Sequence, residues 1–353
     1  MPTRPGPGRA RWRWWAGGLL LLAFSQCRPA VEPYQTERFD LTAGPAAAEG
    51  YPMEIEEGRF TTSDGKSIPF AAEFLEGDWG LSHSGVVSGD GTAPAPDSLE
   101  VRWFSYTEDK FYQGRWPMPQ KRIHTLLKEG YWNTDHKKHE TYAELTLCLL
   151  PKGVAVVWLT GRNQVLLGRY QGQEVAFDFQ QFNPAANRAR MIAQEQAKLP
   201  AAVQARIRAG TLGTQPWDAY LKTYPWRLQF SQPLTLYNYG IFYFNAEMTQ
   251  YPLTQDTRLQ TKNLLEPSAK PVPNSMLLFV EAGYGRKRQI QVKAFDEAET
   301  LAAFQALRAA HPAAPLTLSV ETDERVRHAR VFVQSEQQRI ELRKSPAAVY
   351  DAD

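Results

Sequence analysis

The sequence contains few of the residues that form covalent cross-links, metal centres or catalytic triads. Its 353 residues include two cysteines and six histidines. Two cysteines exclude a disulfide framework and a cysteine zinc site. The histidines follow no triad pattern, and the stretch SHSG lacks the GxSxG form of a nucleophile elbow. We therefore expect no enzymatic activity and no cofactor.

The amino-terminal leader lacks the length of a membrane-spanning helix. Its apolar run ends at Phe24 and is about 11 residues long, whereas a spanning helix needs about 20. Residues 1–16 carry four arginines and no acidic residue. A basic region followed by a short apolar region is typical of a bacterial export signal.

Cys27 ends the stretch AFSQC at the close of this leader. The arrangement resembles the lipobox of bacterial lipoproteins, in which the cysteine becomes the first mature residue and carries lipid. We therefore predict a lipoprotein signal peptide over residues 1–26 and lipidation of Cys27. The lipid would hold the protein at a bacterial membrane in the cell envelope, facing the periplasm or the surface. A plain secretory signal and an unmodified leader cysteine are the alternatives.

The chain carries little net charge. It has 40 basic and 38 acidic residues, a formal net charge of +2. Without the four leader arginines, 36 basic residues remain against 38 acidic ones, a net charge of −2. A chain this close to neutral is not expected to have the strongly basic face that nucleic-acid binding requires. We therefore expect no nucleic-acid partner.

The length after the leader, about 320 residues, exceeds what one hydrophobic core usually holds, so we expect two lobes. Residues 27–50 are rich in Ala, Gly and Pro and indicate a flexible tether. The lobes then occupy residues 51–182 and 216–353, on either side of a helical connector at 183–215. We predict an α+β fold of antiparallel sheets, each packed with a helix, in two similar ββαββ-type lobes.

Each lobe has the same expected order of elements, which is strand, strand, helix, strand, strand. In the first lobe the elements are LEVRWFSY, FYQGRW, a helix between Pro119 and Gly130, YAELTLCLL and VAVVWLTG. In the second they are SMLLFVEA, RQIQVKAF, a helix over 296–310, LTLSVET and RVRHARVFV. Asp296 and Glu299 have the spacing of a capping box at the start of that helix. A true structural repeat and a coincidence of common motifs both stay open.

The connector is helical in propensity, and Pro200 divides it into two helices. Its apolar residues are few, which favours a pair of surface helices. A basic arm for anionic lipid head groups is the alternative, but Glu195 and several glutamines dilute its positive charge.

Two tryptophans and one basic run are candidate binding residues. Trp79 and Trp132 lie in turn-rich stretches, where an exposed ring can stack on a sugar or anchor a protein interface. The alternative is that both rings pack their loops against the body. Arg286, Lys287 and Arg288 follow the turn GYG and are a candidate contact for an acidic protein partner. A solvated strand end is the alternative for this run.

The stretch NTDHKKHET is the densest group of polar side chains in the sequence. His136 and His139 have HxxH spacing beside Asp135 and Glu140, which makes the two histidines weak candidates for a metal site. The loop setting and two neighbouring lysines argue against such a site, so we predict no metal.

The second cysteine, Cys148, lies in the apolar strand AELTLCLL. We expect a small buried hydrophobic residue there. A catalytic thiol is the alternative, but no neighbour in the sequence would make it acidic.

Four stretches resemble a known family. They are VRWFSYTEDKFYQGRWPMPQKRIHTLLKEG, LPKGVAVVWLTGRNQVLLGRYQGQEV, YPWRLQF and GYGRKRQIQVKAF. In this order they are similar to the bacterial lipoproteins grouped as domain-of-unknown-function family 2931, whose members typically carry a lipoprotein leader. The resemblance implies no catalytic residues, because the family has no established activity. It implies toxin immunity for those members that are encoded near secreted lipase toxins of contractile injection systems.

Taken together, these features predict a membrane-anchored protein that binds a protein partner without catalysis, with toxin immunity as one form of that role. One alternative is an envelope glycan-binding lipoprotein that uses Trp79 or Trp132. Another is a metal-dependent hydrolase at His136 and His139.

Overall fold

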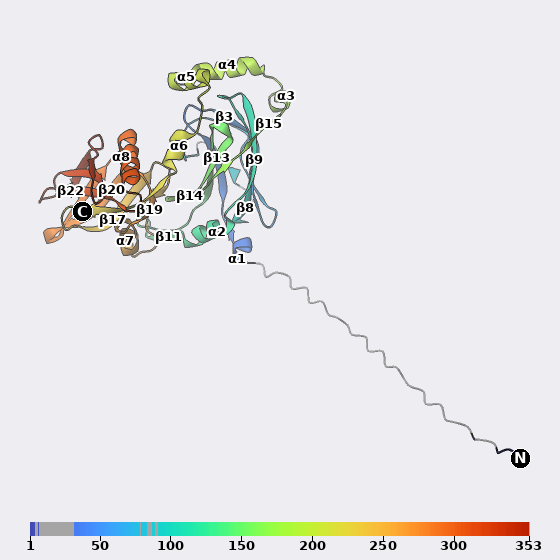
Figure 1. Ribbon diagram of the computed structural model, residues 1–353, viewed down its shortest axis with the longest axis horizontal. Helices are drawn as coiled ribbons and strands as arrows, with labels where there is room; N and C mark the ends of the chain where they lie inside the picture. Colours follow the sequence, from blue (N-terminus) through green and yellow to red (C-terminus); the bar gives the residue numbers. More distant parts are fainter. Residues whose placement is uncertain (4–5, 7–31, 78, 83–86, 89–90, 353) are drawn as a thin grey trace. The chain divides into compact units, whose positions relative to one another are not determined.

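The computed structural model describes residues 1–3, 6, 32–77, 79–82, 87–88 and 91–352. Cys27 and nearly all of the predicted signal peptide lie outside the described residues. The chain divides into the units Met1–Glu32 and Pro33–Asp353, and the second unit is the folded body in Figure 1. No helix of the described part is long and apolar enough to cross a membrane.

The folded body has an α+β architecture, as the sequence predicts. The helices of the described residues are α1 (Pro33–Thr36), α2 (Gln120–Glu129), α3 (Phe179–Phe182), α4 (Arg188–Lys198), α5 (Ala201–Ala209), α6 (Gln215–Tyr220), α7 (Thr257–Leu265) and α8 (Glu297–Ala310).

A large mixed sheet runs through both lobes. Within the described residues it has 15 strands. In spatial order they are β19 (Ser268–Pro271), β16 (Thr223–Phe230), β22 (Leu316–Thr322), β23 (Ala329–Gln334), β25 (Ala347–Asp351), β21 (Arg286–Val292), β20 (Pro273–Ala282), β17 (Thr235–Tyr243), β18 (Met248–Thr249), β14 (Gln164–Gln171), β13 (Val154–Thr160), β12 (Glu144–Leu150), β2 (Thr42–Ala47) and β6 (Val87–Ser88), with β24 (Arg339–Glu341) paired to β23. The short strand β18 joins the lobes, because it pairs with β17 on one side and with β14 on the other.

A smaller antiparallel sheet belongs to the first lobe. Its order is β15 (Gln173–Val175), β9 (Lys110–Pro117), β8 (Pro96–Ser105), β3 (Met53–Thr62) and β4 (Ser67–Pro69), with β5 (Phe74–Leu75) also on β3. Two short pairs complete the described strands: β1 (Arg38–Phe39) with β7 (Ala93–Pro94), and β10 (Tyr131–Asn133) with β11 (Lys138–Glu140).

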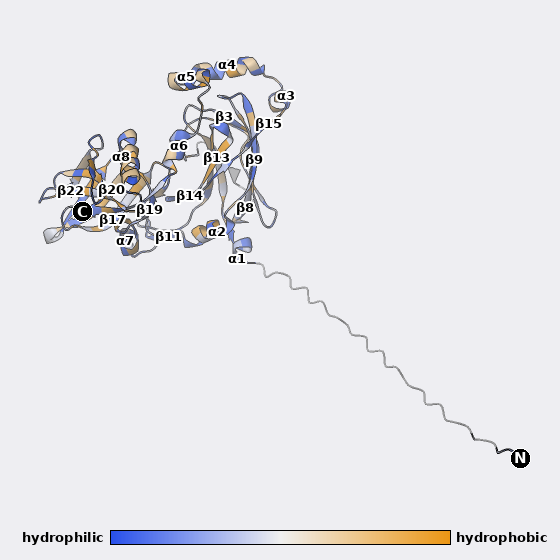
Figure 2. Ribbon diagram, in the orientation of Figure 1, coloured by the Kyte–Doolittle hydropathy of each residue, from blue (hydrophilic) through white to orange (hydrophobic). Residues whose placement is uncertain are grey.

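The first hydrophobic core lies between the smaller sheet and the first-lobe part of the large sheet. Trp103 of β8 and Trp158 of β13 are both fully buried in it. Figure 2 shows mostly hydrophobic residues along β13, and the strand is buried over nearly its whole length. A strand that is apolar on both faces is stable only when both faces are covered.

The second core lies between helix α8 and the sheet of the second lobe. The ring of Phe304 on α8 lies 5.5 Å from the ring of Tyr224 and 6.2 Å from that of Trp226, both on β16. The side chain of Asp296 accepts a hydrogen bond from the backbone nitrogen of Glu299. The predicted start of this helix is therefore confirmed, but the capping box is only half formed, because the backbone nitrogen of Asp296 donates to the hydroxyl of Ser345 and not to Glu299.

Both lobes contain the predicted strands and helix, but the first lobe has the additional hairpin β10–β11 after α2, and the pairing patterns differ. In the second lobe the hairpins β20–β21 and β22–β23 lie in one sheet, with α8 between them in the chain. In the first lobe β8–β9 and β12–β13 lie in different sheets, so the prediction of two similar lobes is wrong in its packing. The difference arises because apolar β12 and β13 are covered on a second face by a sheet and not by a helix.

The prediction of a flexible tether over 27–50 is wrong from Pro33 onward. Strand β2 pairs parallel with β12 and antiparallel with β6, inside the large sheet. Its alanines Ala43, Ala46 and Ala47 are at most 1% exposed. The small residues serve close packing: a Cβ on Gly44 would lie 2.5 Å from the Cβ of Ser82. The Ala, Gly and Pro content alone suggested a flexible segment. In β2 these small residues instead allow the neighbouring chain to approach closely.

The connector has the predicted form. Helices α4 and α5 lie on either side of Pro200, and α5 ends at Gly210, which adopts the left-handed conformation typical of helix ends. Leu199 and Val203 anchor this pair in the first core. Figure 1 shows α3, α4 and α5 following one another at one end of the first lobe.

Candidate functional site

Trp79 is part of the packing between the lobes and not an exposed platform. Its indole nitrogen donates a 2.8 Å hydrogen bond to the backbone carbonyl of Phe244. Its ring meets that of Trp158 edge-on, with 4.9 Å between centroids. Of the two roles that the sequence leaves open for Trp79, these contacts support the packing one, and the side chain is half-buried.

Trp132 lies in the short hairpin of β10 and β11, half-buried, opposite His139. Its backbone nitrogen donates a 2.7 Å hydrogen bond to the carbonyl of Pro252, which ties the hairpin to the second lobe. This position also fits the packing role better than a sugar platform.

The two histidines of the HxxH stretch have separate partners. Nδ1 of His136 lies 3.0 Å from Oε1 of Glu140, and Nε2 of His139 lies 2.6 Å from the carbonyl oxygen of Glu129. Hydrogen bonds from Asn133 and His136 lower the pKa of Glu140 to about 2. Nowhere in the described ranges do three or more His, Cys, Asp or Glu residues form a group that could hold a metal ion.

The basic run lies at the start of β21, and its members are held by neighbours. Arg288 forms an ion pair with Asp351 on β25. Lys287 stands opposite Glu281 in the hairpin with β20, and Arg286 donates a 3.2 Å hydrogen bond to the carbonyl of Gly283. The run is a strand end, with Arg286 and Lys287 exposed to solvent.

Cys148 is fully buried in β12, as predicted. Burial raises the pKa of its thiol to about 12. The thiol is therefore protonated at neutral pH, which argues against the catalytic alternative.

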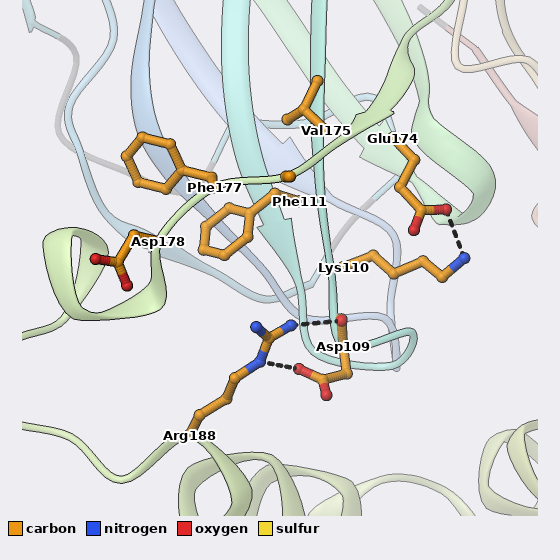
Figure 3. Close-up of a pocket in the computed structure, with 9 residues that line it drawn as sticks. Asp109, Lys110, Phe111, Glu174, Val175, Phe177, Asp178 and Arg188 are labelled. Carbon is orange, nitrogen blue, oxygen red and sulfur yellow. Dashed lines mark hydrogen bonds and ion pairs between the residues drawn. The ribbon is translucent and has the colours of Figure 1, made fainter.

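A hollow that the sequence analysis missed lies at the edge of the smaller sheet, with a volume of about 460 Å³. We call it the edge hollow, and its lining residues are Asp109, Lys110, Phe111, Glu174, Val175, Ala176, Phe177, Asp178 and Arg188. It is formed by the turn before β9, by β15 with the segment after it, and by the first residue of α4. Figure 3 shows the rings of Phe111 and Phe177 next to each other above the Arg188–Asp109 pair.

Arg188 is fixed in the edge hollow by charge and by aromatic rings. Its Nε lies 2.7 Å from Oδ1 of Asp109, and its Nη2 lies 2.8 Å from the carbonyl oxygen of the same residue. Its guanidinium lies 5.4 Å from the ring of Phe179 and 5.6 Å from that of Phe104, within cation–π distance. Asp109 has a φ of 53°, which is uncommon for a residue other than glycine, so this ion pair also holds the turn.

Phenylalanines form the floor of the edge hollow. The centroids of Phe111 and Phe177 are 5.2 Å apart, and the guanidinium of Arg102 lies 4.4 Å over the ring of Phe177. Phe177 is half-buried, so part of its ring faces solvent. The stretch VAFDFQQF, with three aromatics among polar residues, was the sequence signal for this cluster.

The remaining charges of the edge hollow are also engaged. Nζ of Lys110 lies 2.6 Å from Oε2 of Glu174, and this contact raises the pKa of the lysine. Asp178 accepts a hydrogen bond from the backbone nitrogen of Gln180 and caps α3. The lining contains no Ser, Thr, Cys or His. The lining therefore combines aromatic rings with side chains that are already ion-paired or hydrogen-bonded.

Strand β15 borders the edge hollow and ends its sheet. It pairs with β9 through Gln173, Glu174 and Val175, and no described strand pairs with its other side. Such an edge has backbone groups available to an added strand.

The comparisons with known proteins identify one family. Its model, described as a protein of unknown function (DUF2931), matches residues 28–212. This range ends just after α5, so it covers the edge hollow and leaves the second lobe outside. No curated protein and no solved structure matches the chain. Because the match covers more than half of the chain, the protein belongs to the DUF2931 family.

Proposed function

We propose that this chain is a lipid-anchored binding protein of the bacterial cell envelope, without catalytic activity, and that its partner is a protein. The edge hollow carries the proposal. It combines an arginine with a half-buried phenylalanine ring, residue types that are enriched in protein interfaces.

The fixed geometry of the edge hollow favours binding. Arg188 and Lys110 already form ion pairs with Asp109 and Glu174. Side chains held in place lose little conformational freedom when a partner binds, which lowers the cost of association. The open side of β15 adds main-chain groups next to Phe177, so an extended segment of the partner fits this edge as an additional strand.

The position of the anchor limits where the partner is found. The folded body begins at Pro33, and the six residues from Cys27 to Glu32 span at most about 20 Å. With lipid on Cys27, the body would remain close to the membrane surface. In the most specific form of this function, the protein occludes a secreted toxin that is encoded beside it.

The first experiment compares partner recovery among variants in gently solubilised membranes. Phe177→Ala and Arg188→Ala should each reduce binding of the partner by about tenfold or more, the usual effect of removing an interface anchor. Arg190→Ala is the matched control, because Arg190 is exposed two residues further along α4. Equal loss in all three variants, or no loss in any, contradicts the proposed site.

The anchor has its own test. Cys27→Ser should leave the protein folded and remove it from the membrane fraction, and the intact mass should lack lipid. Equal membrane recovery of both proteins contradicts the lipid anchor without affecting the test of the edge hollow.

A further inference from the structure

A second cavity lies where the two lobes meet, with a volume of about 560 Å³. We call it the junction cavity. Its lining includes Glu129, Tyr239, Glu247, Gln260 and Lys270. This volume and the mixture of aromatic and polar side chains are typical of small-molecule sites.

Lys270 is the cation of the junction cavity. Its ammonium donates hydrogen bonds of 2.6 and 2.8 Å to the carbonyls of Trp226 and Glu266, and it lies 5.1 Å from the Trp226 ring. Its partners among the described residues are these two carbonyls and the ring, and none of them is a carboxylate. An ammonium has three protons to donate, so one is left for a ligand.

Gln260 supplies neutral hydrogen-bonding groups. It lines the junction cavity from α7 and is 7% exposed. Neither its Nε2 nor its Oε1 has a hydrogen-bond partner. Its backbone carbonyl accepts a 3.3 Å bond from the hydroxyl of Tyr239, which fixes the helix turn that carries it. A buried amide without partners is costly in a folded protein, and a bound ligand can satisfy it after a small side-chain adjustment.

The acidic residues of the lining leave this pair of donors free. Glu247 accepts hydrogen bonds from the backbone nitrogen of Leu166 and from the amide of Asn245, one on each oxygen. Glu129 is exposed at the end of α2. We propose that the junction cavity binds a small organic carboxylate, whose oxygens accept hydrogen bonds from the ammonium of Lys270 and the amide of Gln260, with tyrosine rings around its apolar part.

Matched carboxylates and amides test this site by titration calorimetry on the full chain at pH 7. The probes are benzoate with benzamide and hexanoate with hexanamide. We expect each carboxylate to bind about tenfold more tightly than its amide, the size of effect usual for a charge-assisted hydrogen bond. No binding by any probe, or equal binding within each pair, overturns the proposal.

Substitutions test whether Lys270 and Gln260 cause the preference for carboxylates over amides. Lys270→Met should abolish the preference for carboxylates, and Gln260→Leu should weaken their binding severalfold. Lys262→Met is the control, since Lys262 is exposed on α7 and pairs with Glu266. A preference that survives Lys270→Met overturns the proposal. Because the cavity is separate from the edge hollow, either site can fail without affecting the other.

If Lys270→Met does not fold, a pH titration of the unmodified chain tests whether the ammonium of Lys270 binds the carboxylate. Burial lowers the pKa of Lys270 to about 8, so binding of benzoate should weaken between pH 7 and 9.5 while binding of benzamide stays constant. The other titratable groups that line the cavity are Glu129, Glu247, Tyr142, Tyr239, Tyr243 and Tyr251, and α7 adds Arg258 and Lys262 next to it. Tyr224 on β16 lies opposite Lys270, and burial raises its pKa as well. Burial raises the pKa of these tyrosines, which keeps them protonated over this range. Constant benzoate affinity contradicts a role for Lys270.

Discussion

The indole of Trp79 donates a hydrogen bond to the carbonyl of Phe244, and the indole of Trp158 donates one to the carbonyl of Asn245, the next residue. The two rings meet edge-on at an interplanar angle of 88°. A pair of first-lobe tryptophans therefore holds two consecutive residues of the second lobe. This contact fixes the lobes to each other beside the strand β18.

Trp79→Phe should destabilise the protein by about 1–3 kcal/mol, because the carbonyl of buried Phe244 loses its donor. Urea unfolding measures the change. Trp132→Phe is the control, since Trp132 is half-buried and none of the described residues accepts a hydrogen bond from its indole. Equal effects of the two substitutions would show that the hydrogen bond of Trp79 contributes nothing.

Ala46→Asp should destabilise the protein by about 4 kcal/mol or more, because it places a carboxylate in the middle of the large sheet. Thermal unfolding provides the measurement. Glu49→Lys changes an exposed residue just beyond the strand and should have little effect. A flexible tether at this position would tolerate both substitutions equally.

Asp64 ties β1 to the turn between β3 and β4. Hydrogen bonds from Thr62 and Arg38 lower its pKa to about 2, below the ordinary value of 3.8. The stabilisation is therefore complete above about pH 4 and is lost as the pH falls through 2. Asp64→Asn should be less stable than the unmodified chain above pH 4, and the difference should vanish near pH 2.

The measurement for Asp64 is urea unfolding over this pH range, with Asp40→Asn as the control for an exposed acid in the same segment. A difference in stability that does not change with pH would mean that the ion pair of Asp64 with Arg38 does not form in solution.

Cys148 should resist alkylation in the folded protein. Its raised pKa keeps the thiol protonated, and its burial excludes reagents. The test uses Cys27→Ser, so that Cys148 is the remaining thiol, and follows iodoacetamide labelling by mass spectrometry. Labelling is expected in concentrated guanidinium chloride and not in buffer. Rapid labelling in buffer would mean that β12 opens readily.

Local patterns predicted the elements of this fold well. The alternation in LEVRWFSY gave the strand β8, and the spacing of Asp296 and Glu299 marked the start of α8. Both depend on neighbours in sequence, such as alternating burial or a side chain that caps its own helix.

Long-range pairing was beyond these patterns. Nothing in the local sequence shows that β8–β9 and β12–β13 lie in different sheets. The turn of each hairpin determines only how its own two strands pair. The stretch TAGPAA was interpreted as flexible because Ala, Gly and Pro are common in linkers. Its burial depends on β12, which lies about 100 residues away in the chain.

The candidate sites were missed for a similar reason. The edge hollow joins the turn at Asp109 to α4 at Arg188, and the junction cavity joins α2 to α7. The sequence pattern instead singled out tryptophans and clustered charges. The side chains of Trp79 and Arg288 already have partners within the fold, the carbonyl of Phe244 and the carboxylate of Asp351. Aromatic spacing in VAFDFQQF was a usable signal, because it places three phenylalanine rings within eight residues.

The most direct test of the central claim is photo-crosslinking in the bacterium, with a photoreactive phenylalanine analogue at Phe177. Tyr350, which is 50% exposed on β25, is the control position. We predict one protein crosslinked at position 177 and not at 350, and loss of that product when Arg188→Ala is added. Crosslinks of equal yield at both positions, or no crosslinked protein at 177, would contradict a protein partner at the edge hollow.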